Sequence, residues 1–403
     1  MQSRALVVAL LLAAAPAAAA AAPPWAFDEA IDVTTGHGPA IFHHLESAGR
    51  RGIAVSDGTV AVVWEDNRGG RPGCYVALKR AGDARFATEI RLSGDAPAFE
   101  PVIAPLGGGR FLAAWEEDGR PHLRLLTVAG AGKTVRIESE GGQITLAAAD
   151  SAVAAAWARR EGRFSRIVVA PVAVEGDDVR LQPPQPVDPA PPVDDQQYPT
   201  LTVGPGGAVN IAWEDRRHGH TRIVRSRAAD GRTFSPLEQV NELSSMRNTQ
   251  GLGRGMGAMR VSLARFGADG VVAVWADKRD FLSGYDVYAG LSTDGGGRFG
   301  RNEKVQDGFG NEIAQWHPAV TAHASGAIAV AWDDDRDGTP DIWLSWKIAS
   351  GWSDDVAPPG ASGAGAQVEP VLALDEAGDL HLAWIDKPGL NAPTRIRYLR
   401  GRR

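Results

Sequence analysis

Short hydrophobic stretches alternate with polar, glycine-rich turns along most of the chain. Seven of these stretches end in a tryptophan, and successive tryptophans are 42 to 62 residues apart: Trp64, Trp115, Trp157, Trp213, Trp275, Trp332 and Trp384. Five of them have a glycine six residues earlier, and four have a proline fourteen residues earlier. A hydrophobic pattern that keeps this register indicates one structural unit repeated seven times.

Each repeat predicts short strands and no helix. In the second repeat, residues 101–105 are apolar, residues 107–109 are glycines, and residues 111–115 are apolar again. Such stretches are too short for helices and are bounded by turn residues. A polar turn follows the tryptophan, and two further strands complete the unit. Four strands in about 50 residues are typical of a propeller blade, so the sequence predicts an all-β, seven-bladed β-propeller.

The two ends of the chain predict how the ring closes. The last repeat supplies only three strands, at residues 368–374, 380–384 and 395–399. Near the N-terminus, Phe27 precedes Val33 by six residues, the spacing that leads into the fourth strand in three other repeats. We therefore expect residues 27–34 to be the missing fourth strand of the last blade, which would remove the open sheet edges.

Composition narrows the class of protein. Residues 1–22 have the pattern of a secretory signal, with Arg4 before an apolar stretch and small residues at the end, so we expect export to the periplasm or beyond. Residues 23–403 would then form a single propeller domain. A net charge of −7 argues against a nucleic-acid partner, and no later apolar run is long enough to span a membrane. We expect a monomer without an intrachain disulfide, since Cys74 is the only cysteine.

One turn resembles a known family motif. Residues 292–299 read Ser-Thr-Asp-Gly-Gly-Gly-Arg-Phe, which resembles the Asp-box of the bacterial-neuraminidase repeat in sialidase-like propellers, with a departure only at Arg298. The matching positions are Ser292, Asp294, Gly296 and Phe299. This motif is a folding device whose Asp and Ser satisfy backbone N–H groups. The resemblance implies that ligands bind on the opposite face, where the turns between second and third strands meet the links between blades.

That face carries a repeated Asp-x-Arg just after the tryptophan. The pairs are Asp66 with Arg68, Asp215 with Arg217, Asp277 with Arg279, and Asp334 with Arg336. Each pair could be a local ion pair that braces its hairpin. Alternatively, the arginines could hold an anionic or sugar ligand, because a guanidinium offers a fixed fork of donors. Tyr198 and His317 fall on the same face and complete the candidate ligand-binding residues.

The resemblance also implies a demanding catalytic set for a sialidase: three arginines, a tyrosine with a glutamate, and an aspartic acid. Residues 50–54 match the first arginine motif only loosely, and residues 68–74 contain no carboxylate. Tyr198 and Tyr285 have no obvious glutamate partner. No catalytic residue is therefore predicted. The main hypothesis is a non-enzymatic exported propeller that binds a glycan or an extracytoplasmic protein, and the alternative is a sialidase-like glycoside hydrolase.

Two groups of residues suggest metal ions. Asp333, Asp335, Asp337 and Asp341 resemble a calcium loop of the integrin-propeller type, although a solvated polar hairpin is the competing interpretation. Imidazole and thioether groups that could suit copper are also predicted on the ligand face, which makes a periplasmic metal-binding propeller a third hypothesis. These groups are His37, His43, His44, His122, His218, His220, His317, Met246, Met256 and Met259. No other cofactor is expected.

Overall fold

The computed structural model describes residues 22–35, 38, 40–45, 51–242, 257–279, 284–389 and 392–403. The expected signal segment, residues 1–22, lies outside these residues except for its last residue. In the described part of the chain, no helix is long and apolar enough to cross a membrane.

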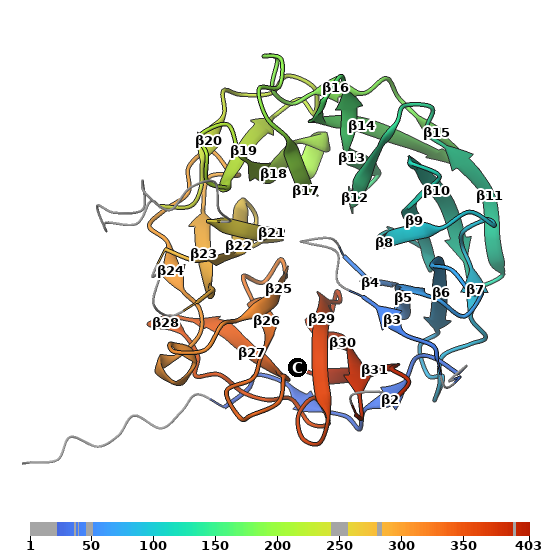
Figure 1. Cartoon of the computed structure of the whole chain (residues 1–403), viewed down its shortest axis with the longest axis vertical. Coiled ribbons are helices and arrows are strands. Elements are labelled where there is room, and N and C mark those ends of the chain that lie inside the picture. The colour runs from blue at the N-terminus through green and yellow to red at the C-terminus, as the bar shows by residue number, and fades with distance from the viewer. Residues whose placement is uncertain are drawn as a thin grey trace, which may run out of the picture.

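Seven antiparallel sheets are arranged radially around a central axis, which confirms the predicted seven-bladed propeller (Figure 1). Within each blade, the strands follow one another from the centre outwards. Blade 1 consists of β3 (His43–His44), β4 (Ile53–Ser56), β5 (Thr59–Asp66), β6 (Gly73–Lys79) and β7 (Ile90–Arg91). Blade 2 consists of β8 (Ala98–Gly107), β9 (Arg110–Glu117), β10 (Arg120–Thr127) and β11 (Gly130–Arg136). Blade 3 consists of β12 (Gly141–Ala149), β13 (Ala152–Glu161), β14 (Phe164–Glu175), β15 (Asp178–Leu181) and β16 (Gln185–Pro186).

Blades 4 to 7 repeat the same plan. Blade 4 consists of β17 (Gln196–Val203), β18 (Val209–Asp215), β19 (Arg222–Ala228) and β20 (Glu238–Gln239), and blade 5 of β21 (Ala258–Phe266), β22 (Gly270–Asp277), β23 (Asp286–Ser292) and β24 (Glu303–Lys304). Blade 6 consists of β25 (Trp316–Ala322), β26 (Ile328–Asp334), β27 (Asp341–Ile348) and β28 (Gly351–Trp352). Blade 7 consists of β29 (Ala366–Leu374), β30 (Leu380–Lys387), β31 (Arg395–Arg402), β1 (Ala26–Phe27) and β2 (Ile31–Asp32). Short 3-10 helices, η1 (Pro205–Gly207) and η3 (Gly308–Gly310), lie in two connections.

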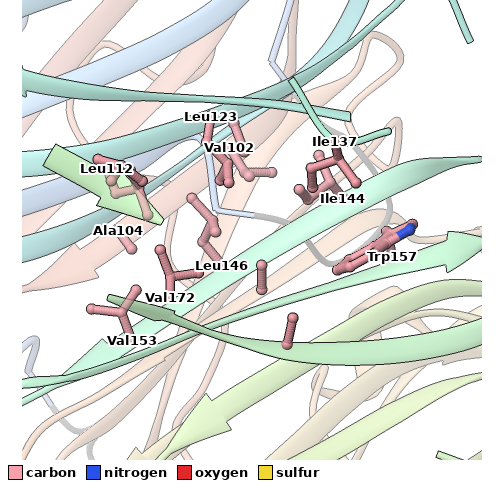
Figure 2. Close-up of a cluster of buried hydrophobic side chains, with 14 of the residues drawn as sticks. Val102, Ala104, Leu112, Leu123, Ile137, Ile144, Leu146, Val153, Trp157 and Val172 are labelled. Carbon is pink, nitrogen blue, oxygen red and sulfur yellow. The ribbon is translucent and has the colours of Figure 1, made fainter. Parts of the chain in front are cut away.

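The core lies between neighbouring blades. All seven repeat tryptophans are fully buried at the second strand of their blades. Figure 2 shows the cluster between blades 2 and 3, where Val102 and Leu112 face Leu146 and Trp157. Because both faces of a blade pack against neighbours, the second strands are nearly continuous apolar runs rather than alternating ones.

The N-terminal segment closes the ring as predicted. Ala26 pairs with Arg402 in β31, and Ile31 pairs with Tyr398. The expected single strand is instead two short strands, β1 and β2, separated by residues 28–30. Asp28 still donates its backbone N–H to the Arg400 carbonyl, so the segment stays attached through the break.

The two faces of the disk differ in what they carry. We call upper the face with the interblade links and the turns between second and third strands, and lower the opposite face. The Asp-box turn is on the lower face, where Ser292 Oγ donates to Asp294 Oδ1 at 2.6 Å. Asp294 also accepts the Arg298 N–H at 2.9 Å, and Gly296 donates its N–H to Ser292 Oγ at 3.0 Å. Phe299 packs against the hydrophobic cluster between blades 4 and 5.

Candidate functional site

The repeated Asp-x-Arg forms the same arrangement in blades 1, 4, 5 and 6. In blade 5, Trp275 Nε1 donates to Asp277 Oδ2 at 2.9 Å, and Arg279 Nη2 donates to the same oxygen at 2.6 Å. The Arg279 backbone N–H binds the other carboxylate oxygen at 2.9 Å. The guanidinium also lies over the ring of Tyr288, 3.9 Å from its centroid.

Each of these arginines also contacts a second acidic side chain. Arg68 binds Glu89, Arg217 binds Asp188 at 2.8 Å, Arg279 lies 3.5 Å from Glu242, and Arg336 binds Asp355 at 2.8 Å. Asp188 and Glu242 belong to the links before blades 4 and 5, so Arg217 and Arg279 each join a hairpin to the preceding link. Since the guanidinium donors are engaged within the protein, this geometry favours the brace over the ligand-binding interpretation.

A second ring of residues lies at the upper ends of the inner strands. In six blades one non-glycine residue there has left-handed backbone geometry, with φ between 50° and 58°: Glu100, Gln143, Tyr198, Arg260, His317 and Glu369. Each sits at a shift in register between the first and second strands of its blade. A bulge of this kind redirects the side chain and is common beside functional sites.

Sequence reasoning predicted only two members of this ring, Tyr198 and His317. A signal for two more was present, because Glu100 and Glu369 also lie fifteen residues before a repeat tryptophan and directly before a proline. Arg260 keeps the fifteen-residue spacing to Trp275 but is followed by valine, and Gln143 has neither that spacing nor the proline.

Acidic residues stitch this ring together across the blades. Glu65 accepts the backbone N–H of Glu100 at 3.3 Å, and Glu214 accepts that of Arg260 at 2.8 Å. Asp333 accepts the N–H of Glu369 at 2.9 Å. Glu116 likewise accepts the backbone N–H of Gln143. Each of the four acceptors directly follows a repeat tryptophan, and each binds the bulged residue of the next blade at the upper face.

A polar network spans blades 6, 7 and 1. His317 Nδ1 lies 2.6 Å from Asp333 Oδ1, and His44 Nδ1 lies 2.8 Å from Glu369 Oε2. Glu369 Oε2 also accepts the backbone N–H of Leu45 at 2.8 Å. Because Asp333 binds the Glu369 backbone, the four side chains of His317, Asp333, Glu369 and His44 form one connected group, which we call the rim network.

The acids of this region have opposite pKa shifts. Burial raises the pKa of Glu65 and of Asp333. Burial alone would also raise the pKa of Glu369, but the hydrogen bond and charge of His44 outweigh it and lower the pKa to about 2. The site therefore combines one carboxylate whose pKa is lowered with two acids whose pKa values are raised by burial.

An aromatic pair includes the residue that directly precedes His317 of the rim network. Trp316, directly before His317, is 39% exposed, and its ring lies 5.3 Å from that of Tyr285. Five of the six large hydrophobic side chains that are exposed among the described residues are on the upper face: Phe42, Phe99, Val193, Phe309 and Trp316. These five residues are spread over several blades, and only Trp316 both lies in an aromatic pair and directly adjoins a residue of the rim network.

The predicted metal sites do not assemble in the described part of the chain, where no group of three or more His, Cys, Asp or Glu side chains could hold a metal ion. Asp333 faces the rim network, whereas Asp341 accepts the Gly363 N–H at 3.0 Å, and Asp335 and Asp337 are exposed. The four aspartates therefore do not converge in this geometry, which favours the competing interpretation of a polar hairpin.

The described members of the histidine and methionine group do not come together at one metal site either. The described histidines have separate partners: His43 binds Thr394, His122 stacks on Trp115, and His44 and His317 belong to the rim network. His218 and His220 lie in the turn after β18, and Met259 lies in β21. His37, Met246 and Met256 lie outside the described residues.

Neither a family model nor a curated protein sequence matches the chain. Solved structures share its fold. A Penicillium chrysogenum α-L-arabinanase complexed with arabinobiose is 14% identical, with 75% of this chain and 92% of that chain covered and a TM-score of 0.50. A puromycin-hydrolysing peptidase of Mycobacterium tuberculosis is 15% identical over 86% of this chain and 50% of that chain, with a TM-score of 0.51.

The β-propeller domain of a Pyrococcus furiosus protease has a TM-score of 0.50, with 10% identity over 86% of this chain and 94% of that chain. At such identities the likeness shows a common propeller fold alone. The fold is thus shared with glycoside hydrolases and peptidases, and it selects neither activity.

Proposed function

We propose that this protein binds a carbohydrate on its upper face, between the Trp316 and Tyr285 rings and the rim network. The observation that carries the proposal is the exposed Trp316 indole, held against Tyr285 and directly adjoining His317. A sugar ring has an apolar face that stacks on an aromatic ring and hydroxyl groups that hydrogen-bond to polar side chains. Binding sites commonly combine aromatic walls with a few such polar groups.

Two further observations support a sugar ligand. The arabinanase of the same fold was solved with arabinobiose bound. The arginines that would hold the carboxylate of a sialic acid are engaged with aspartates, which favours a neutral over a sialylated sugar. We further propose that residues 1–22 direct export, so that the ligand would be encountered outside the cytoplasm.

Calorimetric titration of the mature chain with neutral oligosaccharides, arabinobiose among them, tests the proposal. We expect saturable binding and a loss of about tenfold or more in affinity for Trp316→Ala. The reason is that a ligand ring stacked on an aromatic side chain contributes on the order of 1–3 kcal/mol to binding. Phe309→Ala is the control, since Phe309 is 88% exposed and lies in the link at η3, outside the rim network. Absence of any oligosaccharide binding, or equal loss in both variants, would overturn the proposal.

The opposite pKa shifts favour a second candidate function, glycoside hydrolysis. Hydrolysis by two carboxyl groups needs one acid with a raised pKa and one ionised carboxylate, and the opposite pKa shifts of Glu65 or Asp333 and of Glu369 are consistent with that requirement. If the protein is a hydrolase, Glu369→Gln and Glu65→Gln will abolish release of reducing sugar while a bound oligosaccharide is retained. Binding without any turnover by the unaltered chain would restrict the function to recognition.

A further inference from the structure

A separate pocket of about 290 Å³ opens on the lower face, between blades 3 and 4. One wall comes from β13 and β14, with Ala152, Ala154, Val169 and Pro171 among its residues. The hairpin between β17 and β18 forms the opposite wall. Neither the rim network nor the aromatic residues of the upper face take part in this pocket.

Small side chains explain why the two blades leave this space. The second strand of blade 3 carries Ala154, Ala155 and Ala156 in succession just before Trp157. Ala154 pairs with Pro171 in β14, so that part of the wall has no side chain longer than a pyrrolidine ring. Figure 2 shows Val153 and Val172, which also line the pocket and belong to the core between blades 2 and 3. Close-packed interiors seldom leave such a gap, since its lining loses dispersion contacts.

Hydrogen-bond donors occupy the rim of this apolar pocket. Ser151, Gln182 and Arg232 are exposed lining residues, and their side chains have no hydrogen-bond partner among the described residues. Asp230 is the one carboxylate of the lining, and it is directed into its own turn. It accepts the N–H groups of Arg232 and Thr233 at 2.9 and 2.6 Å and the Thr233 hydroxyl at 2.7 Å. Ser151 and Gln182 can each donate a hydrogen bond as well as accept one, and Arg232 is a pure donor and the one cation of the lining, so the unengaged groups at the rim can bind an anionic oxygen.

We propose that this pocket binds a free monocarboxylate with an apolar body, such as a medium-chain fatty acid. The aliphatic walls would take the chain, and Arg232, with its forked donors, would take the carboxylate. The volume sets the size of the ligand: at about 30 Å³ per non-hydrogen atom, the share of a water molecule in the liquid, the pocket holds about ten such atoms. Octanoate meets both conditions.

Titration calorimetry of the mature chain with octanoate tests this second site. We expect one saturable site that binds octanoate, binds octanol more weakly, and does not bind acetate. Arg232→Gln should weaken octanoate binding about tenfold, the usual effect of removing a charged hydrogen-bond donor. Arg71→Gln is the matched control, because Arg71 is also exposed and has no partner among the described residues but lies on the upper face.

Filling the pocket gives an independent check. Ala152 is only partly buried at the start of β13, so Ala152→Leu should block the pocket without disturbing the blade core, and Ala173→Leu in β14 serves the same purpose if that variant does not fold. Loss of octanoate binding with unchanged oligosaccharide binding would support the proposal. It is overturned if octanoate does not saturate, if octanol binds equally well, or if a filled pocket binds octanoate as tightly. None of these outcomes affects the proposed upper-face site.

Discussion

On the upper face, Asp277 holds its hairpin together through a nearly buried ion pair with Arg279. Its side chain is 3% exposed and that of Arg279 is 11% exposed, so this is a nearly buried ion pair. Such pairs lose much of their attraction to desolvation unless further hydrogen bonds satisfy the charges. Here the Trp275 indole, the Arg279 backbone and Asn302 provide those bonds. These bonds offset the desolvation of the ion pair, and Arg279 also links the hairpin of blade 5 to Glu242 in the preceding interblade link.

Asp277→Ala should destabilise the protein by about 3–5 kcal/mol, because it leaves a buried guanidinium and a buried indole N–H without their acceptor. Urea denaturation of the mature chain measures this change. Asp335→Ala is the control, because Asp335 is exposed in the hairpin of blade 6, and it should change stability by less than about 0.5 kcal/mol. If Asp277 instead contacted the sugar, its removal would lower oligosaccharide affinity at nearly constant stability.

Glu369 ties blade 7 to the link before blade 1 through its carboxylate, which accepts the Leu45 N–H and lies 2.8 Å from His44. Its pKa is about 2 in the folded protein against an ordinary value of 4.5. A lowered folded-state pKa stabilises the protein above the unfolded-state pKa, and this contribution is lost as the pH falls through the folded-state value. We therefore expect about 3 kcal/mol of unfolding free energy to disappear between pH 4.5 and pH 2.

The difference between the original chain and Glu369→Gln isolates this effect, because the glutamine cannot titrate. Urea denaturation at several pH values between 5 and 2 should show the two free energies of unfolding converging as the pH falls. A constant difference over that range would show that His44 and Leu45 do not hold Glu369 ionised as the geometry implies.

At the scale of strands and turns, the sequence predicted the features that recur at fixed spacing in several repeats. It did not predict backbone conformations that depend on a hydrogen-bond acceptor in another blade. The tryptophan register predicted the blades, and the Phe27-to-Val33 spacing predicted the closing strand. The bulges at Gln143 and Arg260 could not be predicted, because their conformation depends on acceptors in the preceding blade. The repeated Asp-x-Arg was recognised, but the choice between its two interpretations depended on the second acidic side chain that each arginine contacts, which no sequence spacing marks.

The Asp-box turn of blade 5 is also an interblade contact, which makes Gly296 its most sensitive residue. Gly296 has a φ of 84°, and a Cβ there would overlap with the Asn210 side chain of blade 4. Its carbonyl accepts a hydrogen bond from the buried Arg225. Gly296→Ala should therefore cost about 2–4 kcal/mol, from backbone strain together with overpacking.

Gly162→Ala is the matched control for that substitution. Gly162 has a φ of 62°, but a Cβ there meets no other atom within 4 Å, so only the strain of about 1–2 kcal/mol remains. Thermal and urea denaturation of both variants measures the difference. Asn210→Ala in the Gly296→Ala background should restore part of the lost stability, and a cost equal to that of Gly162→Ala would contradict the contact.

At the scale of the whole molecule, the stability of the ring depends on a joint between residues far apart in the chain. Trp25 is 5% exposed, donates its indole N–H to the Gly378 carbonyl at 3.0 Å, and lies edge-on to Trp346 at 6.2 Å. It therefore connects the N-terminal segment to blades 6 and 7 at once. Each blade buries both faces on its neighbours, so opening one joint exposes apolar surface on two blades.

Trp25→Ala should for this reason destabilise the whole ring by about 3–5 kcal/mol, the usual cost of truncating a buried tryptophan. Circular dichroism during heating should show one cooperative transition at a lower temperature, with Phe309→Ala as an exposed control that leaves it unchanged. If the N-terminal segment merely frays, limited proteolysis will release it while the melting temperature stays the same. That outcome would mean that the seven blades hold together without the closing strands, and that the joint is an accessory to the fold.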